Sequence, residues 1–262
     1  MLFVMLKGSD IYNPAFDVRL YVSDLSYDKE FYDRWYELMP QRRRERADRF
    51  KNGIDAHRCI AAYALLAGAV CDLAKDIDLG LHKETLAKIG SGSLDICEED
   101  KGKPFFKDIP LCFNISHAGE RVIVALSPAD VGCDVERRSK NAMSVAKRFF
   151  ADAEYRFLAG IDDEDELSHR FTRIWTQKES VVKCSGEGIS RPFDGFCVID
   201  EHGNAAGTIS LPDKECDYHI REFEGEMGYC YSICSLYDHM ETSIRRIKMH
   251  LPVHGCGGIS YK

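Results

Sequence analysis

The strongest constraint on the fold of this chain is a short strand-like run that carries two acidic residues. Asp134 and Glu136 interrupt the otherwise apolar run Val131–Glu136. Residues i and i+2 of a strand point to the same face, so the two carboxylates lie side by side, repel each other and attract a cation. Oxygen ligands of this kind suit Mg²⁺, which usually keeps waters and substrate phosphates as its other ligands. About forty residues later, Glu179 and Lys183 stand one helical turn apart, which adds the remaining groups of a phosphoryl-transfer site.

Both pairs also have a simpler structural interpretation. Glu179 and Lys183 are i,i+4 neighbours, where an exposed ion pair contributes only about 0.3–0.5 kcal/mol. Asp134 and Glu136 are followed by two arginines, so they are also compatible with the charged end of an exposed strand. The occurrence of both pairs in the same half of the chain favours the site.

The composition is that of a globular enzyme. The chain has 262 residues, of which 45% are hydrophobic and 30% charged. Its formal net charge of −8 argues against a nucleic-acid-binding surface, so any anion site must be built locally. The eleven cysteines form no CxxC pair, which favours reduced thiols in a cytoplasmic protein over a disulfide frame or a zinc site. Cys230 and Cys234 lie in a strand-like run and are not expected to bind metal.

No segment is expected to cross a membrane. The apolar run Met1–Leu6 is too short for a signal-peptide core or a membrane span, and it is predicted to be a strand. No other window approaches the ~20 apolar residues that a spanning helix needs.

Strand-like and helix-like runs alternate along the first half of the chain. Further strands are predicted at Val18–Val22, Asp95–Cys97, Phe113–Ile115 and Val122–Leu126. Helices are predicted at Tyr27–Met39 and Ala56–Leu73, on either side of the basic run Gln41–Lys51. A turn is expected at Ser116–Glu120, between the last two strands.

The second half begins after a Ser-Pro break at Ser127–Asp130. Strands are predicted at Gly132–Glu136, Phe196–Ile199, Thr208–Leu211, Tyr218–Phe223 and Tyr229–Cys234, and helices at Ser144–Phe149, Leu167–Cys184 and Glu241–Met249. Each half therefore contains a long helix and several strands in similar order. We expect an α+β fold of two similar lobes, residues 1–129 and 130–262, in a pseudo-two-fold arrangement with the active site in the cleft between them.

The helix Leu167–Cys184 has an apolar stripe that contains one lysine. Phe171, Trp175 and Val182 share one face of a 3.6-residue period, and Lys178 lies in the middle of that face. A second candidate group is Ser116 with His117, at the end of a predicted strand, where hydroxyl, imidazole and backbone N–H groups can bind phosphate. The chain has no Gly-x-Ser-x-Gly turn beside this pair, which excludes a serine hydrolase of that type.

These motifs together resemble the 4′-phosphopantetheinyl transferase family. Val131–Glu136 and Trp175–Lys183 are similar to its two defining motifs. Four other blocks are similar to the family pattern and occur in its order: Asp55–Arg58, Gly102–Pro104, Phe113–His117 and Ala146–Phe150. The resemblance covers about residues 42–192, and the length favours the large, pseudo-dimeric subfamily that serves peptide and polyketide synthases over the shorter, trimeric subfamily that serves fatty-acid carriers.

The resemblance implies that the phosphopantetheine arm of coenzyme A moves to a serine of a carrier protein, releasing adenosine 3′,5′-bisphosphate. By the same resemblance, Asp134, Glu136 and Glu179 hold Mg²⁺. Glu179 takes the proton of the carrier serine, directly or through a water, and Lys183 stabilises charge on the leaving group. No enzyme nucleophile is needed, because positioning and charge neutralisation suffice for direct transfer.

The resemblance also assigns the residues that bind coenzyme A. Lys103, Ser116 and His117 match positions that bind the phosphates of the nucleotide, and Arg58 matches one that binds the 3′-phosphate. Lys183 belongs to the same binding set. Arg42 and Arg46 are additional candidates from the basic run.

The expected partners are coenzyme A and an acidic acyl or peptidyl carrier domain. Because the enzyme itself has a formal net charge of −8, attraction of an acidic carrier requires a local basic patch. Candidates for this patch are Lys147, Arg148 and the arginine run. A monomer is expected, since two halves in one chain already form the cleft. Two alternatives stay open: a non-catalytic homologue that binds coenzyme A or a carrier, and an unrelated Mg²⁺-dependent phosphohydrolase.

Overall fold

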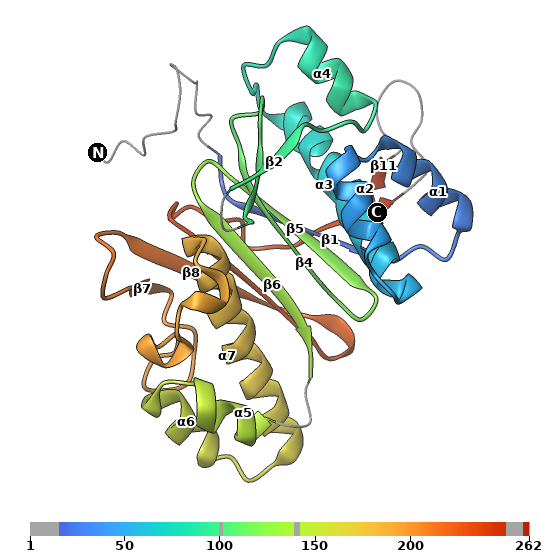
Figure 1. The fold of residues 1–262 in the computed structure, drawn as a ribbon. Coiled ribbons are helices and arrows are strands. Elements are labelled where there is room, and N and C mark those ends of the chain that lie inside the picture. Colours follow the sequence, from blue (N-terminus) through green and yellow to red (C-terminus); the bar gives the residue numbers. More distant parts are fainter. Residues whose placement is uncertain (1–15, 100–101, 139–141, 250–258, 262) are drawn as a thin grey trace.

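Two β-sheets lie face to face at the centre of the molecule, and helices cover their outer faces (Figure 1). The structure is a computed structural model that describes residues 16–99, 102–138, 142–249 and 259–261. The first sheet has the order β11-β10-β1-β5-β4 and the second the order β6-β9-β8-β7. The strands of the first sheet are β1 (Arg19–Asp24), β4 (Cys112–Ala118), β5 (Arg121–Ser127), β10 (Arg245–Met249) and β11 (Ile259–Tyr261). Those of the second are β6 (Val131–Arg137), β7 (Thr208–Ser210), β8 (Asp217–Glu224) and β9 (Tyr229–Ser235).

Each sheet has its own set of helices. The first is covered by α1 (Lys29–Leu38), α2 (Gln41–Asp48), α3 (Gly53–Asp76) and α4 (Lys83–Gly90). The second is covered by α5 (Ala142–Phe149), α6 (Asp152–Ala159) and α7 (Glu164–Ser185). A separate hairpin pairs β2 (Ile96–Glu98) with β3 (Pro104–Phe106), and three short 3₁₀ helices occupy Gly188–Ser190, Phe193–Gly195 and Glu226–Gly228. The expectation of an α+β fold with two lobes is thereby confirmed.

The alternation of side chains along the strands produces three apolar layers. On β5, Val122, Val124 and Leu126 pack into the core below α3, whereas Ile123 and Ala125 point to the other face. That face meets the second sheet in a shared central core. Because neighbouring strand residues point in opposite directions, the β6 residues that alternate with those of the central core face α7 instead.

The acidic residues of β6 are placed by this rule. Val131, Cys133 and Val135 belong to the central core. The residues between and after them, Asp134 and Glu136, therefore point to the opposite face, toward α7. The predicted strand pair of carboxylates and the predicted helix are thus brought together by the packing of α7 on the face of the second sheet opposite the central core.

The C-terminal segment crosses back to the first lobe, where the sequence predicted a helix at Glu241–Met249. That prediction was wrong: β10 runs parallel to β1, with Tyr21 opposite Arg245. The backbone of Val18 also exchanges hydrogen bonds with His239 and Glu241. We call residues 236–249 the C-terminal strap. The boundary between residues 129 and 130 falls between β5 and β6, and we propose that this boundary separates the lobes, with β10 added to the N-terminal one.

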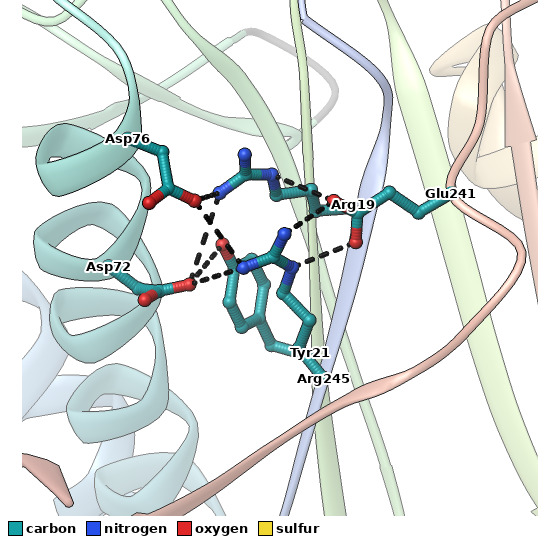
Figure 2. A network of polar contacts seen from close by, with 6 residues as sticks. All are labelled: Arg19, Tyr21, Asp72, Asp76, Glu241 and Arg245. Atoms are coloured by element: carbon teal, nitrogen blue, oxygen red, sulfur yellow. Dashed lines mark hydrogen bonds and ion pairs between the residues drawn. The ribbon is translucent and has the colours of Figure 1, made fainter. Parts of the chain in front are cut away.

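A network of polar side chains holds the strap against α3 (Figure 2). Glu241 accepts hydrogen bonds from Arg245 at 2.6 and 2.8 Å and pairs with the Arg19 Nε at 3.2 Å. Arg19 also pairs with Asp76 at 2.8 Å, and Arg245 pairs with Asp72 at 3.3 Å. The Arg19 side chain is 8% exposed, so its charge depends on these carboxylates rather than on water.

Removing one charge from this network is expected to destabilise the protein. Because Glu241→Gln leaves Arg19 with one fewer carboxylate in a largely buried place, we expect a loss of about 1–3 kcal/mol in the free energy of unfolding, measured by urea denaturation. Arg246→Gln is the matched control: Arg246 lies in the same C-terminal strap, but its pair with Glu226 is exposed, so little change is expected. Equal stability of the two variants would show that the network does not hold the strap.

Most other predicted elements are confirmed, with three differences. The predicted strand Phe196–Ile199 is only an isolated bridge between Ile199 and Ala205, because the backbone N–H of Val198 bonds to the carboxylate of Glu154 instead of a strand. The predicted turn Ser116–Glu120 is shorter, since β4 continues to Ala118. The helices α2, α4 and α6 were not predicted. The strand predicted at Met1–Leu6 lies outside the described residues.

Two further expectations concern membranes and thiols. The sequence predicted no segment apolar enough to span a membrane, but the helix α3 is long and apolar enough by length and composition. In the structure, 67% of its apolar window is buried inside the protein. The ten cysteines in the described part of the chain are free thiols, as expected. Cys230 and Cys234 are buried on β9, in agreement with the predicted strand.

Candidate active site

The site begins with a close contact between α7 and β6. A Cβ atom at Gly132 would overlap the backbone oxygen of Ser180 and the backbone nitrogen of Cys184. Only a residue without a side chain therefore allows the helix to lie so near the strand. The helix is limited at both ends, by the Asp163 side chain that accepts from the Glu166 N–H and by Gly186 in the left-handed region at φ 70°.

This contact brings Lys183 onto Asp134. The Lys183 Nζ lies 2.5 Å from Asp134 Oδ1 and 3.1 Å from the Ser116 Oγ, and it also donates to the Cys133 carbonyl at 3.3 Å. Ser116 donates to the same Asp134 oxygen at 2.8 Å. Burial acts to lower the pKa of Lys183, but the Asp134 carboxylate outweighs it and raises this pKa. A strand of the N-terminal lobe and two elements of the C-terminal lobe therefore meet at one carboxylate.

The other two carboxylates of the predicted metal set lie beside this cluster. Burial and the negative charge of Asp134 raise the pKa of Glu136 to about 7, with a smaller contribution from Glu179. Burial also raises the pKa of Glu179, which Lys183 lowers and Asp134 raises. Like charges raise each other's pKa only at short range, so Asp134, Glu136 and Glu179 share one electrostatic environment.

The chemistry of these donors fits a divalent cation. Asp134 is 3% exposed, and its Oδ2 is buried without a hydrogen-bond partner in the described part of the chain. A buried carboxylate oxygen without a partner is costly, and a cation would satisfy it. Within the described ranges, no group of three or more His, Cys, Asp or Glu side chains is already arranged as a metal cage. Asp134, Glu136 and Glu179 would therefore have to move closer together to coordinate one cation.

The N-terminal lobe contributes basic groups at the turn between β4 and β5. The Arg58 Nε donates to the Gly119 carbonyl at 2.9 Å, and its Nη1 pairs with Asp55 at 2.6 Å. Desolvation and the positive charge of Arg58 lower the pKa of His117, with a further contribution from Lys183, although the residue is accessible to solvent. Burial and the positive charges of Arg58 and Lys183 therefore favour the neutral form of His117.

Ser116 and Lys103 are engaged differently from what their sequence context suggested. Ser116 lies inside β4 opposite Ile123, not in a free turn, and its hydroxyl donates a hydrogen bond to Asp134. The Lys103 Nζ pairs with Asp130 at 2.7 Å and donates to the Cys184 carbonyl at 2.9 Å. Lys103 therefore joins the connection between the lobes to the C-terminal end of α7, and a phosphate would have to compete with Asp130 for it.

Comparisons with known proteins agree with this geometry. Residues 130–234 match the family model described as the 4′-phosphopantetheinyl transferase superfamily. The chain is 28% identical over 225 residues to the 4′-phosphopantetheinyl transferase Sfp of Bacillus subtilis, which covers 86% of this chain and 94% of the relative. It is 30% identical over 207 residues to another 4′-phosphopantetheinyl transferase of Bacillus subtilis, covering 78% and 85%. The chain belongs to the 4′-phosphopantetheinyl transferase family. The transferase gsp of Aneurinibacillus migulanus is 35% identical over 140 residues, which are 53% of this chain and 57% of the relative.

Sequence reasoning missed several residues that support the site of this phosphopantetheinyl transferase. Asn114 on β4 accepts the backbone N–H of Cys133 on β6 at 3.0 Å, which fixes the two strands to each other beside Asp134. Asp55 and Asp130 pair with the two predicted phosphate-binding cations of the N-terminal lobe. The signal for Asn114 was a polar residue between Phe113 and Ile115 in a buried strand. Asp55 and Arg58 are i,i+3 neighbours on a helix, whereas the pair of Lys103 with Asp130 has no local sequence pattern.

Proposed function

We propose that this transferase moves 4′-phosphopantetheine from coenzyme A to a serine of a carrier protein, with Mg²⁺, and releases adenosine 3′,5′-bisphosphate. One observation in this member of the family carries the proposal. Asp134 accepts hydrogen bonds from Ser116 of the N-terminal lobe and Lys183 of the C-terminal lobe, and its second carboxylate oxygen, which has no hydrogen-bond partner among the described residues, is available to a cation. The serine Oγ–phosphorus bond forms as the bond between that phosphorus and the bisphosphate breaks.

The residues supply positioning and charge. Asp134, Glu136 and Glu179 would hold Mg²⁺, which when bound neutralises charge on the phosphate under attack. Glu179 accepts the proton of the carrier serine, directly or through a water, because its raised pKa brings it nearer to neutral pH than an ordinary carboxylate. Lys183 stabilises the charge that develops on the leaving phosphate.

Binding of coenzyme A uses both lobes. Arg58, His117 and Lys103 come from the N-terminal lobe and Lys183 from the C-terminal one. Arg58 would bind the 3′-phosphate, with Asp55 holding its guanidinium in place. His117 would donate a hydrogen bond to another phosphate, and Ser116 would donate to one only by leaving Asp134. Lys103 would reach a phosphate only by leaving Asp130.

The proposal extends to the partner and the setting of the enzyme. Lys147 and Arg148 are exposed on α5, next to the 41% exposed Phe149, and would attract an acidic carrier domain. The arginine run forms α2, where Arg42 is already paired with Glu98 at 2.9 Å. We propose a monomeric, cytoplasmic enzyme that needs neither nucleic acid nor a membrane.

One assay distinguishes the proposal from its alternatives. The protein is incubated with coenzyme A, Mg²⁺ and an apo carrier domain, and the carrier is analysed by mass spectrometry. A gain of one phosphopantetheine on serine is expected. An unmodified carrier with coenzyme A still bound would identify a non-catalytic binding homologue, and release of free phosphate without carrier modification would identify a phosphohydrolase.

His117 is expected to act mainly in binding coenzyme A. Since His117→Ala removes a hydrogen-bond donor to a phosphate, the Michaelis constant for coenzyme A should rise about tenfold, as expected for a lost bond to a charged group of about 1.5 kcal/mol, with a smaller change in kcat. Steady-state kinetics measure both. His202→Ala, at an exposed turn in the other lobe, is the control. An unchanged Michaelis constant in the His117 variant would contradict this role.

A further inference from the structure

A second lysine of α7 lies away from the site, and it is one of the two most completely enclosed charges described in the C-terminal lobe. Lys178 is 0% exposed within an apolar core. Its Nζ lies 2.8 Å from Glu154 Oε2 and donates to the carbonyls of Phe193 at 2.7 Å and Phe196 at 2.6 Å. An ammonium group has three N–H donors, so every one of them has a partner.

The partner carboxylate is equally enclosed and equally satisfied. Glu154 is 0% exposed, and its Oε1 accepts the backbone N–H of Val198 at 2.9 Å. Its Oε2 also accepts the backbone N–H of Ala151, at 3.0 Å, at the start of α6. The ion pair therefore joins α6, α7 and the segment that follows the 3₁₀ helix at Phe193–Gly195.

Stability alone does not account for charges in this place. Two ions taken from water into an apolar core lose hydration, and apolar residues of similar volume are often as stable or more so. The pair instead fixes the orientation of the Lys178 side chain, because each of its hydrogen bonds can form in only one orientation. The Phe196 ring, whose centroid is 4.4 Å from the Lys178 Nζ, restricts that orientation further.

The direction of Lys178 determines where its neighbour on the helix points. Successive residues of an α-helix are about 100° apart around the axis. With Lys178 fixed toward α6, Glu179 is turned toward β6, and Lys183 follows one turn later on the same side as Glu179. A rotation of α7 that broke the buried pair would move both of these groups away from Asp134.

We propose that the buried Lys178–Glu154 pair is a positioning element that sets the rotation of α7 and so presents Glu179 and Lys183 to Asp134. This inference rests on the proposed function, because the positioned groups are those assigned to transfer. Lys178 touches neither substrate nor metal in this scheme and acts only through α7.

The test removes both charges and keeps the side-chain volumes. The double variant Lys178→Met, Glu154→Gln is compared with Glu166→Gln, Arg170→Gln, which removes an exposed ion pair on the same helix. A displacement of about 1 Å at reacting groups costs about 10²-fold in rate, so kcat of the core double variant should fall by about 10²-fold. The Michaelis constant for coenzyme A should change less than kcat, because Lys183 is displaced whereas the binding residues of the N-terminal lobe stay in place. The control pair should leave both constants unchanged.

A fluorescence readout follows α7 without any transfer. The chain has two tryptophans, and Trp35→Phe leaves Trp175 on α7 as the single reporter. The Trp175 ring lies 5.3 Å from that of Phe193, whose carbonyl binds Lys178, so its emission should shift in the core double variant and not in the control. If the core double variant does not fold, Glu154→Asp keeps both charges but moves the carboxylate back, and it should lower kcat and shift the emission in the same way.

The outcomes separate the two proposals. A folded core variant, or a Glu154→Asp variant, with wild-type kcat and unchanged Trp175 emission would overturn the positioning role alone. A wild-type enzyme that modifies no carrier would instead overturn the proposed function, and the Trp175 measurement would still report whether the pair sets the position of α7.

Discussion

Glu179→Gln is expected to lower the rate of phosphopantetheine transfer by about 10²–10⁴-fold while coenzyme A still binds. The amide keeps the size of the side chain but cannot accept the serine proton, and it removes one of three negative charges from the metal set. Burial raises the pKa of Glu179, Lys183 lowers it and Asp134 raises it, so the other charges of the site act on this carboxylate. Transfer is measured by the mass of the carrier and binding by calorimetric titration with coenzyme A.

The control for this variant is a carboxylate in the first turn of the same helix. Glu166 is 44% exposed and pairs with Arg170, so Glu166→Gln should leave transfer close to that of the wild type. If Glu179→Gln lost both binding and transfer, the role of Glu179 would be structural. If it lost neither, another group would have to accept the proton.

Gly132→Ala is expected to have the second largest effect, although it adds a single methyl group. The new Cβ would overlap backbone atoms of Ser180 and Cys184, and backbone atoms cannot move aside as the end of a flexible side chain can. The helix must therefore shift away from β6. We expect a loss of about 3 kcal/mol in the free energy of unfolding, at the upper end of overpacking effects, and a fall in kcat of about 10²-fold because Lys183 leaves Asp134.

Gly160→Ala provides the matched control. A Cβ at Gly160 would make only ordinary contacts, the nearest at 3.5 Å from the Phe157 oxygen, and Gly160 has a φ of −85° that any residue adopts. Stability is measured by urea denaturation and transfer by the carrier mass. Wild-type kinetics in a folded Gly132→Ala variant would show that the close contact is not needed for the site.

The local parts of the site were readable from the sequence. Two carboxylates at i and i+2 of a strand and a Glu–Lys pair at i and i+4 of a helix are patterns with a fixed period, and both elements form where they were predicted. The long α3 and the strands β4 and β5 were predicted for the same reason. The pattern even set Lys178 apart, as the one charge in an apolar stripe.

Contacts between distant segments were not readable in this way. Ser116 was expected in a turn as a phosphate ligand, whereas the structure places its hydroxyl on Asp134. Lys103 was expected to bind a phosphate of the nucleotide, and its ammonium group is paired with Asp130. The last predicted helix is β10, because the segment gains a parallel partner in β1 from the opposite end of the chain.

The sequence by itself determined which faces of its strands and helices are apolar, and thereby the fold class, the family resemblance and the identity of the acidic and basic groups. Only the tertiary structure decided which partner each face meets: Gly132 against Ser180, Lys178 against Glu154, and Asp134 between Ser116 and Lys183. The physical reason is that periodicity records whether a side chain is buried, whereas distance and charge pairing depend on how separate elements pack in space.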